Sequence, residues 1–200
     1  KKYLLKSELS YINDLLNTSD FKKNLFVFEI GSKKKIILIS IKKNLKNSDA
    51  ENLGAEFYGR INHGKSNEYN LIADSVIAKN NNFLEHFLHG LKLKSYEFKK
   101  YKTKKESRAL TIHVSGKNIP SMRAQVKFKA LEEGTFYARD LVSEPGNVLH
   151  PDEYAKRLNS LKKDGLKVNI YDQKKLKKMG MHALLGVGQG SVRGSYLVTM

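Results

Sequence analysis

Two histidines, His86 and His89, stand three residues apart in a segment with helical periodicity. This spacing can place two imidazoles on one metal ion, but a metal centre needs three or four protein ligands. The His-Glu-x-x-His pattern is not met, because Glu85 precedes both histidines. We therefore expect a surface or half-buried pair on a helix. The other histidines stand singly, without a nearby Ser or Cys that would indicate nucleophilic catalysis: His63, His113, His150 and His182.

A glycine-rich segment, residues 186–191, follows the apolar run 183–187 and invites comparison with nucleotide-binding loops. A dinucleotide fingerprint would need its third glycine at the position of Ser191, and a P-loop would need a Gly-Lys-Ser/Thr sequence here. Neither template is met. The segment is better explained as a tight backbone turn that closes a strand against a helix.

The densest basic run of the chain, residues 92–105, interleaves lysines with Tyr96, Phe98 and Tyr101. Basic groups between aromatic rings can bind nucleic acid by contacting phosphates and stacking on bases. The alternative is a solvated connector whose aromatic side chains pack inward. On the first hypothesis, the nucleic-acid contacts are Lys94, Lys99, Lys100, Lys102, Lys104 and Lys105.

Strands and helices that position these groups alternate over residues 1–119, which predicts a three-layer α/β domain. Apolar residues at helical spacing predict one helix that starts near Ser48, in a capping box with Glu51, and another over residues 75–93. β-branched and aromatic runs predict strands over residues 25–28, 35–41, 69–73 and 108–114. The second helix would bury an apolar stripe formed by Ile77, Leu84, Leu88 and Leu91.

Residues 120–142 predict a linker helix, with Pro120 suited to its first turn. Small side chains at three of its positions would let another backbone approach closely: Ala130, Gly134 and Ala138. Residues 143–200 predict the incomplete beginning of a second α/β domain. Its elements would be a helix from Pro151, a strand over 166–171, a helix over 173–179 and a strand over 197–200.

The composition restricts the class of protein. Of the 200 residues, 40% are apolar and none is cysteine, which permits a folded core, excludes disulfides and favours a reducing, cytoplasmic location. No apolar run approaches the roughly 20 residues of a membrane helix. The formal net charge of +17 favours polyanionic partners. The excess of 31 Lys over 6 Arg is also expected of an A/T-biased coding sequence, and both explanations stay open.

Several segments between Ser95 and Thr199 follow one another as in a known enzyme family. They are the aromatic connector Ser95 to Thr103, the long helix, Asp140-Leu-Val-Ser-Glu-Pro-Gly-Asn-Val148, Pro151, and Lys178-Met-Gly-Met-His-Ala-Leu-Leu-Gly-Val-Gly-Gln-Gly-Ser191. On these motifs the chain resembles the leucyl aminopeptidases, peptidase family M17. Residues 1–94 match the family only in the order of their strands and helices. The resemblance implies an accessory domain similar to macro domains, the linker helix and the start of a catalytic domain.

The resemblance also implies a metal-dependent aminopeptidase that releases N-terminal amino acids from peptides, with two divalent cations, Mn or Zn, in a homohexamer. In that family the cations activate a water molecule, and a lysine and an arginine stabilise the oxyanion. Asp49-Ala-Glu51 imitates part of one metal-binding motif, but the companion motif is missing from the sequence. Asp49 and Glu51 are better explained as helix-start residues.

We therefore assign no catalytic or metal-binding residue within residues 1–200 and expect this segment alone to be inactive. Its role would be to support the catalytic domain and its assembly. The alternative function is that of a nucleic-acid-binding accessory domain, which would use the connector between Lys92 and Lys105 and would make DNA a partner.

Overall fold

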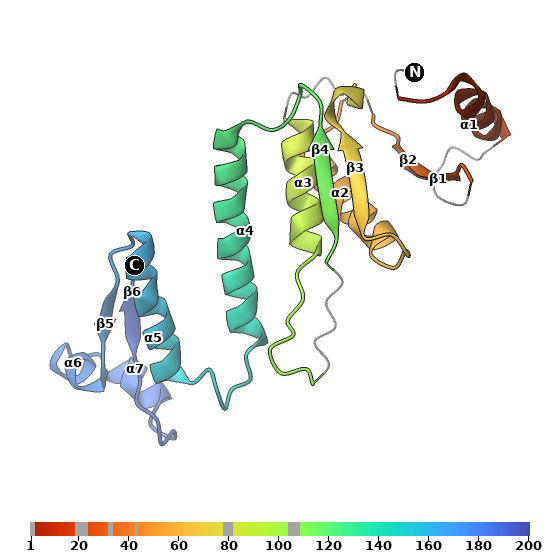
Figure 1. The fold of residues 1–200 in the computed structure, drawn as a ribbon. Coiled ribbons are helices and arrows are strands. Elements are labelled where there is room, and N and C mark those ends of the chain that lie inside the picture. The colour runs from red at the N-terminus through yellow and green to blue at the C-terminus, as the bar shows by residue number, and fades with distance from the viewer. Residues whose placement is uncertain (1–2, 19–23, 32–33, 43, 78–81, 104–108) are drawn as a thin grey trace. The chain divides into compact units, whose positions relative to one another are not determined.

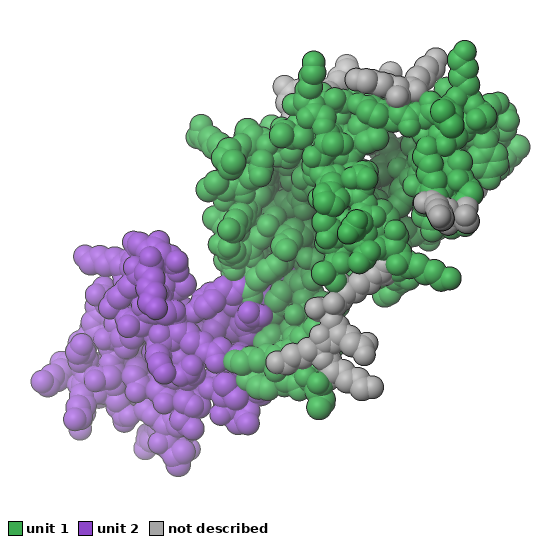
Figure 2. All heavy atoms as spheres, viewed as in Figure 1, with its two compact units in different colours: residues 1–136 green, residues 137–200 purple. Residues whose placement is uncertain are grey.

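The computed structural model describes residues 3–18, 24–31, 34–42, 44–77, 82–103 and 109–200. Figure 1 shows their helices and strands, which form a mixed α/β structure. The chain divides into two compact parts, residues 1–136 and 137–200, which we call unit 1 and unit 2 (Figure 2). The boundary falls inside the long helix α4 (Met122–Ser143), which contributes to both units. The three-part division inferred from the sequence stays a prediction.

Among its described residues, unit 1 contains two separate pairs of strands. β1 (Leu25–Glu29) and β2 (Lys35–Ile39) are antiparallel, whereas β3 (Glu68–Ile72) and β4 (Thr111–Ser115) are parallel. Gly31 has a positive φ of 86° and lies two residues after the end of β1, a backbone conformation that glycine adopts without strain. The four predicted strands are thus confirmed, with shifted ends.

The helices of unit 1 besides α4 are α1 (Lys6–Thr18), α2 (Asn47–Ile61), the 3-10 turn η1 (Ala73–Ser75) and α3 (Phe83–Lys94). The prediction of one helix over residues 75–93 is wrong at its start, and Ile77 is 90% exposed instead of buried. The reason lies in η1, where Asp74 Oδ1 accepts the backbone N–H groups of Lys117 and Asn118 at 2.7 and 3.0 Å. These bonds tie the turn to the loop after β4.

The start of α2 also differs from the prediction. Asp49, not Glu51, caps the helix, because its Oδ2 accepts the backbone N–H of Lys46 at 3.0 Å. Glu51 instead directs its carboxylate to His86 of α3, with 2.7 Å between Oε1 and Nδ1. The capping box predicted between Ser48 and Glu51 is therefore wrong, because a tertiary partner takes the side chain that the local pattern assigned to the cap.

The core of unit 1 forms where α2 packs against α3. Aromatic rings fill this contact, with Phe57 and Phe87 centroids 5.6 Å apart. Two glycines let the helices approach: a Cβ at Gly54 would lie 1.9 Å from the carbonyl oxygen of Phe87, and one at Gly90 would lie 2.0 Å from that of Glu51. No side chain fits at either position without moving a backbone.

The long helix predicted over residues 120–142 is confirmed as α4. Its buried residues are Ala124 and Phe128, whereas Met122 and Val126 are 73% and 62% exposed. Within the described residues no neighbouring atom lies within 4 Å of a Cβ built on Gly134, so the close backbone approach predicted there is not formed. Neither α4 nor any other described helix is long and apolar enough to cross a membrane.

Unit 2 contains four helical segments and one antiparallel pair of strands in the order α5, η2, β5, α6, α7, β6. The predicted helices and strands are confirmed, except that β5 is shorter. The elements are α5 (Pro151–Ser160), η2 (Leu161–Asp164), β5 (Asn169–Tyr171), α6 (Gln173–Lys178), α7 (His182–Val187) and β6 (Leu197–Thr199).

The glycine-rich segment of unit 2 forms the predicted turn over residues 188–190, but the turn follows a helix, α7, and not a strand. None of its glycines has a positive φ, so it does not depend on left-handed backbone. At Gly188 an added Cβ would lie 2.1 Å from Ser195 Oγ, so a larger residue there would require the Ser195 hydroxyl to move.

A buried ion pair joins the end of α4 to α5. Glu144 has a side chain that is only 2% exposed, and its Oε1 accepts a hydrogen bond from Arg157 Nη1 at 3.0 Å. Arg157 Nε also donates to Glu153 Oε1 at 3.1 Å. The hydrogen bond with Glu144, followed in size by the one with Glu153, raises the pKa of Arg157, so the guanidinium stays positively charged. The pair matters because a buried carboxylate without its cation is costly.

We predict that Gly54→Ala and Gly90→Ala each lower the free energy of unfolding by about 1–3 kcal/mol, because the added methyl groups meet backbone atoms. Gly59→Ala, in the same helix as Gly54, has open space and should stabilise the chain by about 0.5–1 kcal/mol through helix propensity. Urea unfolding followed by circular dichroism measures all three. Equal stability of the Gly54 and Gly59 variants would contradict the close packing.

We also predict that Arg157→Ala costs about 3 kcal/mol of unfolding free energy, because it leaves the Glu144 carboxylate buried and without its cation. The matched control is the neighbouring Lys156→Ala. Lys156 is 81% exposed and pairs with Glu153 at 3.8 Å, so its loss should change stability by no more than about 0.5 kcal/mol. Chemical denaturation of both variants tests the difference, and equal effects would show that the buried pair is not stabilising.

Candidate functional site

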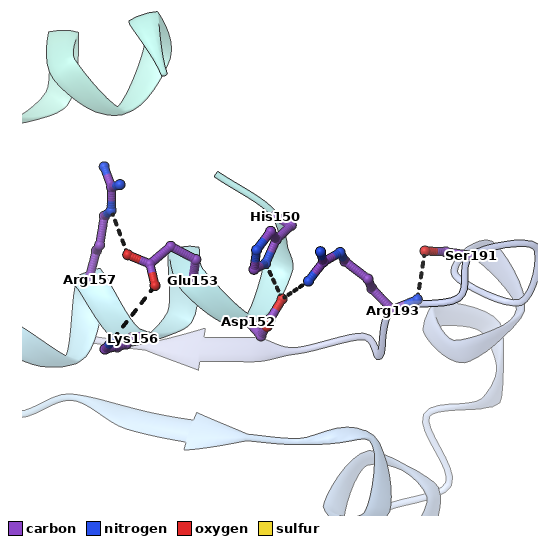
Figure 3. Close-up of polar contacts among 7 residues, drawn as sticks. All are labelled: His150, Asp152, Glu153, Lys156, Arg157, Ser191 and Arg193. Atoms are coloured by element: carbon purple, nitrogen blue, oxygen red, sulfur yellow. Dashed lines mark hydrogen bonds and ion pairs between the residues drawn. The ribbon is translucent and has the colours of Figure 1, made fainter. Parts of the chain in front are cut away.

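One polar group of unit 2 consists of His150, Asp152, Ser191 and Arg193, which we call the polar clasp (Figure 3). The Asp152 carboxylate is its centre: Oδ1 is hydrogen-bonded to His150 Nδ1 and lies 3.4 Å from Arg193 Nη1. The backbone N–H of Arg193 donates to Ser191 Oγ at 3.1 Å. The clasp therefore links the start of α5 to the residues after the glycine-rich turn.

Local sequence explains one half of this arrangement. Pro151 occupies the first turn of α5, so Asp152 stands at the positive end of the helix. Partial burial raises the pKa of Asp152, but the hydrogen bond with His150 and the charge of Arg193 outweigh it, and the pKa is lowered overall. The ionised clasp is thus most stable above the usual titration range of an aspartate and weakens as pH falls through the lowered pKa.

The clasp contains a serine, a histidine and an aspartate, but it is not arranged for nucleophilic catalysis. Ser191 Oγ accepts a backbone N–H, and no hydrogen bond joins it to His150. A nucleophilic serine needs its base within hydrogen-bond reach. The clasp therefore has a structural role: it connects the residues after the glycine-rich turn to the start of α5.

The two histidines of α3 also turn away from metal binding. His86 Nδ1 faces Glu51 of α2 at 2.7 Å, and His89 Nδ1 faces Glu132 of α4 at 3.1 Å. The Phe128 ring lies beside both imidazoles, with centroid distances of 5.0 and 4.8 Å. The prediction of a half-buried pair is confirmed for His86, whereas His89 is buried. The pair connects three helices.

Divalent cations need several carboxylate or imidazole groups that converge on one point. Among residues 3–18, 24–31, 34–42, 44–77, 82–103 and 109–200, no three His, Asp or Glu side chains are grouped to hold a metal ion. The residues present do not fit the dinuclear centre that the family resemblance implies.

The lysines of the predicted nucleic-acid contact differ in their surroundings. Lys99 forms an ion pair with Glu97, and Lys100 Nζ lies 5.5 Å from the centre of the Tyr101 ring. Lys94 and Lys102 are exposed. Lys104 and Lys105 lie outside the described residues.

The aromatic side chains of the same connector pack inward only in part. Tyr96 packs against Phe136 with 5.3 Å between ring centres, but Tyr101 is 54% exposed. A nucleic-acid role for the connector stays a prediction.

Two polar contacts of unit 2 escaped the sequence reasoning. The Glu153–Arg157 spacing of four residues in a helix is a signal that could have predicted that pair. Asp152 and Arg193 are separated by 41 residues and carry no such signal. Only the folded backbone brings them together.

The fold is similar to the folds of two solved structures. A mutant of tomato leucine aminopeptidase matches 99% of this chain and 43% of its own, with a TM-score of 0.78 and 18% sequence identity. The bottromycin maturation enzyme BotP in complex with Mn matches 92% of this chain and 40% of its own, with a TM-score of 0.74 and 19% identity. At such low identity these likenesses concern the fold alone.

Sequence comparison identifies the family. A probable cytosol aminopeptidase of Nitrobacter winogradskyi is 35% identical over 175 residues, which cover 83% of this chain and 35% of the relative. That of Bradyrhizobium sp. is 46% identical over 116 residues, or 56% of this chain and 23% of the relative. The chain thus spans about a third or less of these relatives' length. Residues 136–200 match the model of the cytosol aminopeptidase family, catalytic domain. The chain therefore belongs to the cytosol aminopeptidase family, and its residues 136–200 are part of that family's catalytic domain.

Proposed function

We propose that this chain is the amino-terminal part of a metal-dependent aminopeptidase that releases N-terminal amino acids from peptides. The observation that carries the proposal is its 35% identity, over 175 residues, with a probable cytosol aminopeptidase. The match covers 83% of this chain and therefore extends well beyond the 65 residues of the family model. Both units are thus included in the proposal.

The proposal assigns catalysis to polypeptide outside residues 1–200. Two divalent cations, Mn or Zn, would be held there, because the described residues offer no cluster of suitable ligands. A fold neighbour is described as a complex with Mn, which supports a divalent cation in this family. Bound cations of this kind activate water and polarise a peptide carbonyl.

The residues of this chain would support that centre through position. Arg157 and Glu144 fix α5 to the end of α4, and the Asp152–Arg193 contact fixes the glycine-rich turn to the start of α5. Such rigid first elements are needed because catalytic groups must be held within a fraction of an ångström by their surroundings.

Unit 1 would be an accessory domain with a macro-like fold, and the whole protein a cytoplasmic homohexamer. Helix α4 supplies the support for an assembly role. Four residues at steps of four along the helix are apolar or glycine and exposed, and they form an inclined stripe on its surface, namely Val126, Ala130, Gly134 and Ala138. When a second copy of the protein covers such a stripe, apolar surface is removed from water, which stabilises the assembly.

We predict that the full-length protein hydrolyses leucine p-nitroanilide with added Mn²⁺, that EDTA abolishes the reaction, and that residues 1–200 alone are inactive. The reason is that the fragment lacks a cluster of metal ligands in its described part. Circular dichroism of the fragment provides the folding control. Turnover that copurifies with residues 1–200, or a full-length protein without any activity, would refute the proposed division of roles.

We predict that Val126→Glu or Gly134→Glu in the full-length protein shifts the mass measured by light scattering from a hexamer towards smaller species. A buried, unpaired carboxylate in the interface would cost more than the stripe contributes. Lys129→Glu is the control, because Lys129 is 75% exposed on the same helix and pairs only with Glu133 at 3.9 Å. Hexamers retained by both stripe variants would exclude α4 from the subunit contact.

A further inference from the structure

Unit 2 carries a dense group of lysines that the proposed aminopeptidase function does not use. Residues 162–178 contain seven lysines and two acidic residues. All seven side chains are exposed, and none has an ion-pair partner within the described part of the chain. They are Lys162, Lys163, Lys167, Lys174, Lys175, Lys177 and Lys178. We call them the unit 2 lysines.

The acidic residues of the segment do not neutralise this group. Asp172 caps α6, with its Oδ1 accepting the backbone N–H of Lys175 at 2.9 Å. Asp164, in η2, has no ion-pair partner among the described residues. Seven exposed cations and only two carboxylates produce a positive electrostatic potential, which attracts polyanions.

A groove lies within this basic region. Its volume is about 350 Å³. Lys162 of η2 and Lys175 of α6 line it, so the lysines of two separate elements converge there. The other residues that line it include Asn159, Asn169 and Tyr171. Amides donate and accept hydrogen bonds, and a phenol ring offers a surface on which a base can stack.

We propose that this groove and the unit 2 lysines bind the sugar-phosphate backbone of single-stranded nucleic acid. The lysines neutralise phosphates, while the amides and the phenol of the groove contact a nucleotide that is not hidden in a duplex. Binding is independent of sequence, because lysines act as point charges and the group contains no Arg fork for reading bases. A membrane surface also attracts lysines, but the headgroups of a flat bilayer would not reach into a recessed groove.

The unit 2 lysines suit this role better than the connector between Lys92 and Lys105. In the connector, Lys99 is paired with Glu97 and Lys100 lies against Tyr101. Phosphate binding there would compete with these contacts. Within the described part of the chain no carboxylate pairs with the unit 2 lysines, so phosphate binding there displaces no ion pair. The inference does not depend on peptidase activity, because it uses no group assigned to catalysis.

The test uses the full-length protein and a fluorescent 20-nucleotide oligothymidylate, with anisotropy measured at several salt concentrations. Four reversals in unit 2, Lys162→Glu, Lys163→Glu, Lys175→Glu and Lys178→Glu, should weaken binding by about tenfold or more. They should also make the slope of log K against log salt shallower by up to about 3, since each phosphate contact contributes about 0.7. The matched control makes the same charge change in the connector, at Lys94, Lys99, Lys100 and Lys102, and should leave most of the affinity.

Circular dichroism and light scattering establish that both variants fold. If the reversals disturb folding, the neutral pair Lys162→Gln and Lys175→Gln replaces them and should still weaken binding severalfold. The proposal is overturned if the wild-type protein shows no salt-dependent binding, or if only the connector variant loses affinity. It is also overturned if phosphatidylserine vesicles bind more tightly than the oligonucleotide and lose binding to the same unit 2 variants.

Discussion

The close contact between α2 and α3 is the constraint on which unit 1 depends. The helices approach so closely at Gly54 and Gly90 that an added methyl group would meet a backbone carbonyl. This approach buries the phenylalanine rings between the helices and fixes the direction of α3. His89 can then reach Glu132, and Phe128 can pack beside it, so the position of α4 follows from the α2–α3 contact. A packing constraint between two helices thus orients the helix that leads into unit 2.

Unit 2 is held together by charge to a greater extent than unit 1. Few of its apolar side chains are buried, namely Ala155, Leu158, Val168 and Leu176. The Glu144–Arg157 pair and the Asp152–Arg193 contact join segments that a larger core would otherwise hold. The buried Glu144 carboxylate favours the geometry that keeps Arg157 beside it, because separating the two would leave a buried charge.

The net charge of the chain has two components with different physical meaning. Some cations have protein partners, as Lys34 has in Glu8 at 2.6 Å and Lys35 in Glu29 at 2.9 Å. These hydrogen bonds lower the pKa of each carboxyl group and belong to the fold. The lysines of residues 162–178 have no such partners within the described residues. Biased composition explains how many lysines the chain has, but not why seven of them without such partners fall within residues 162–178, two of them lining one groove.

The sequence by itself determined the local elements and the family. Prolines at 120, 145 and 151 and the apolar periodicity predicted α4 and α5, because these signals act within a few residues. The motifs from Ser95 to Thr199 identified the aminopeptidases for the same reason, since they are read along the chain. Only the tertiary structure decided which face of α4 is buried. It also decided that the Glu51 carboxylate contacts His86 instead of capping its own helix, and that Arg193 contacts Asp152, 41 residues away in the sequence. Such choices depend on the energies of partners distant in sequence, and no local pattern contains them.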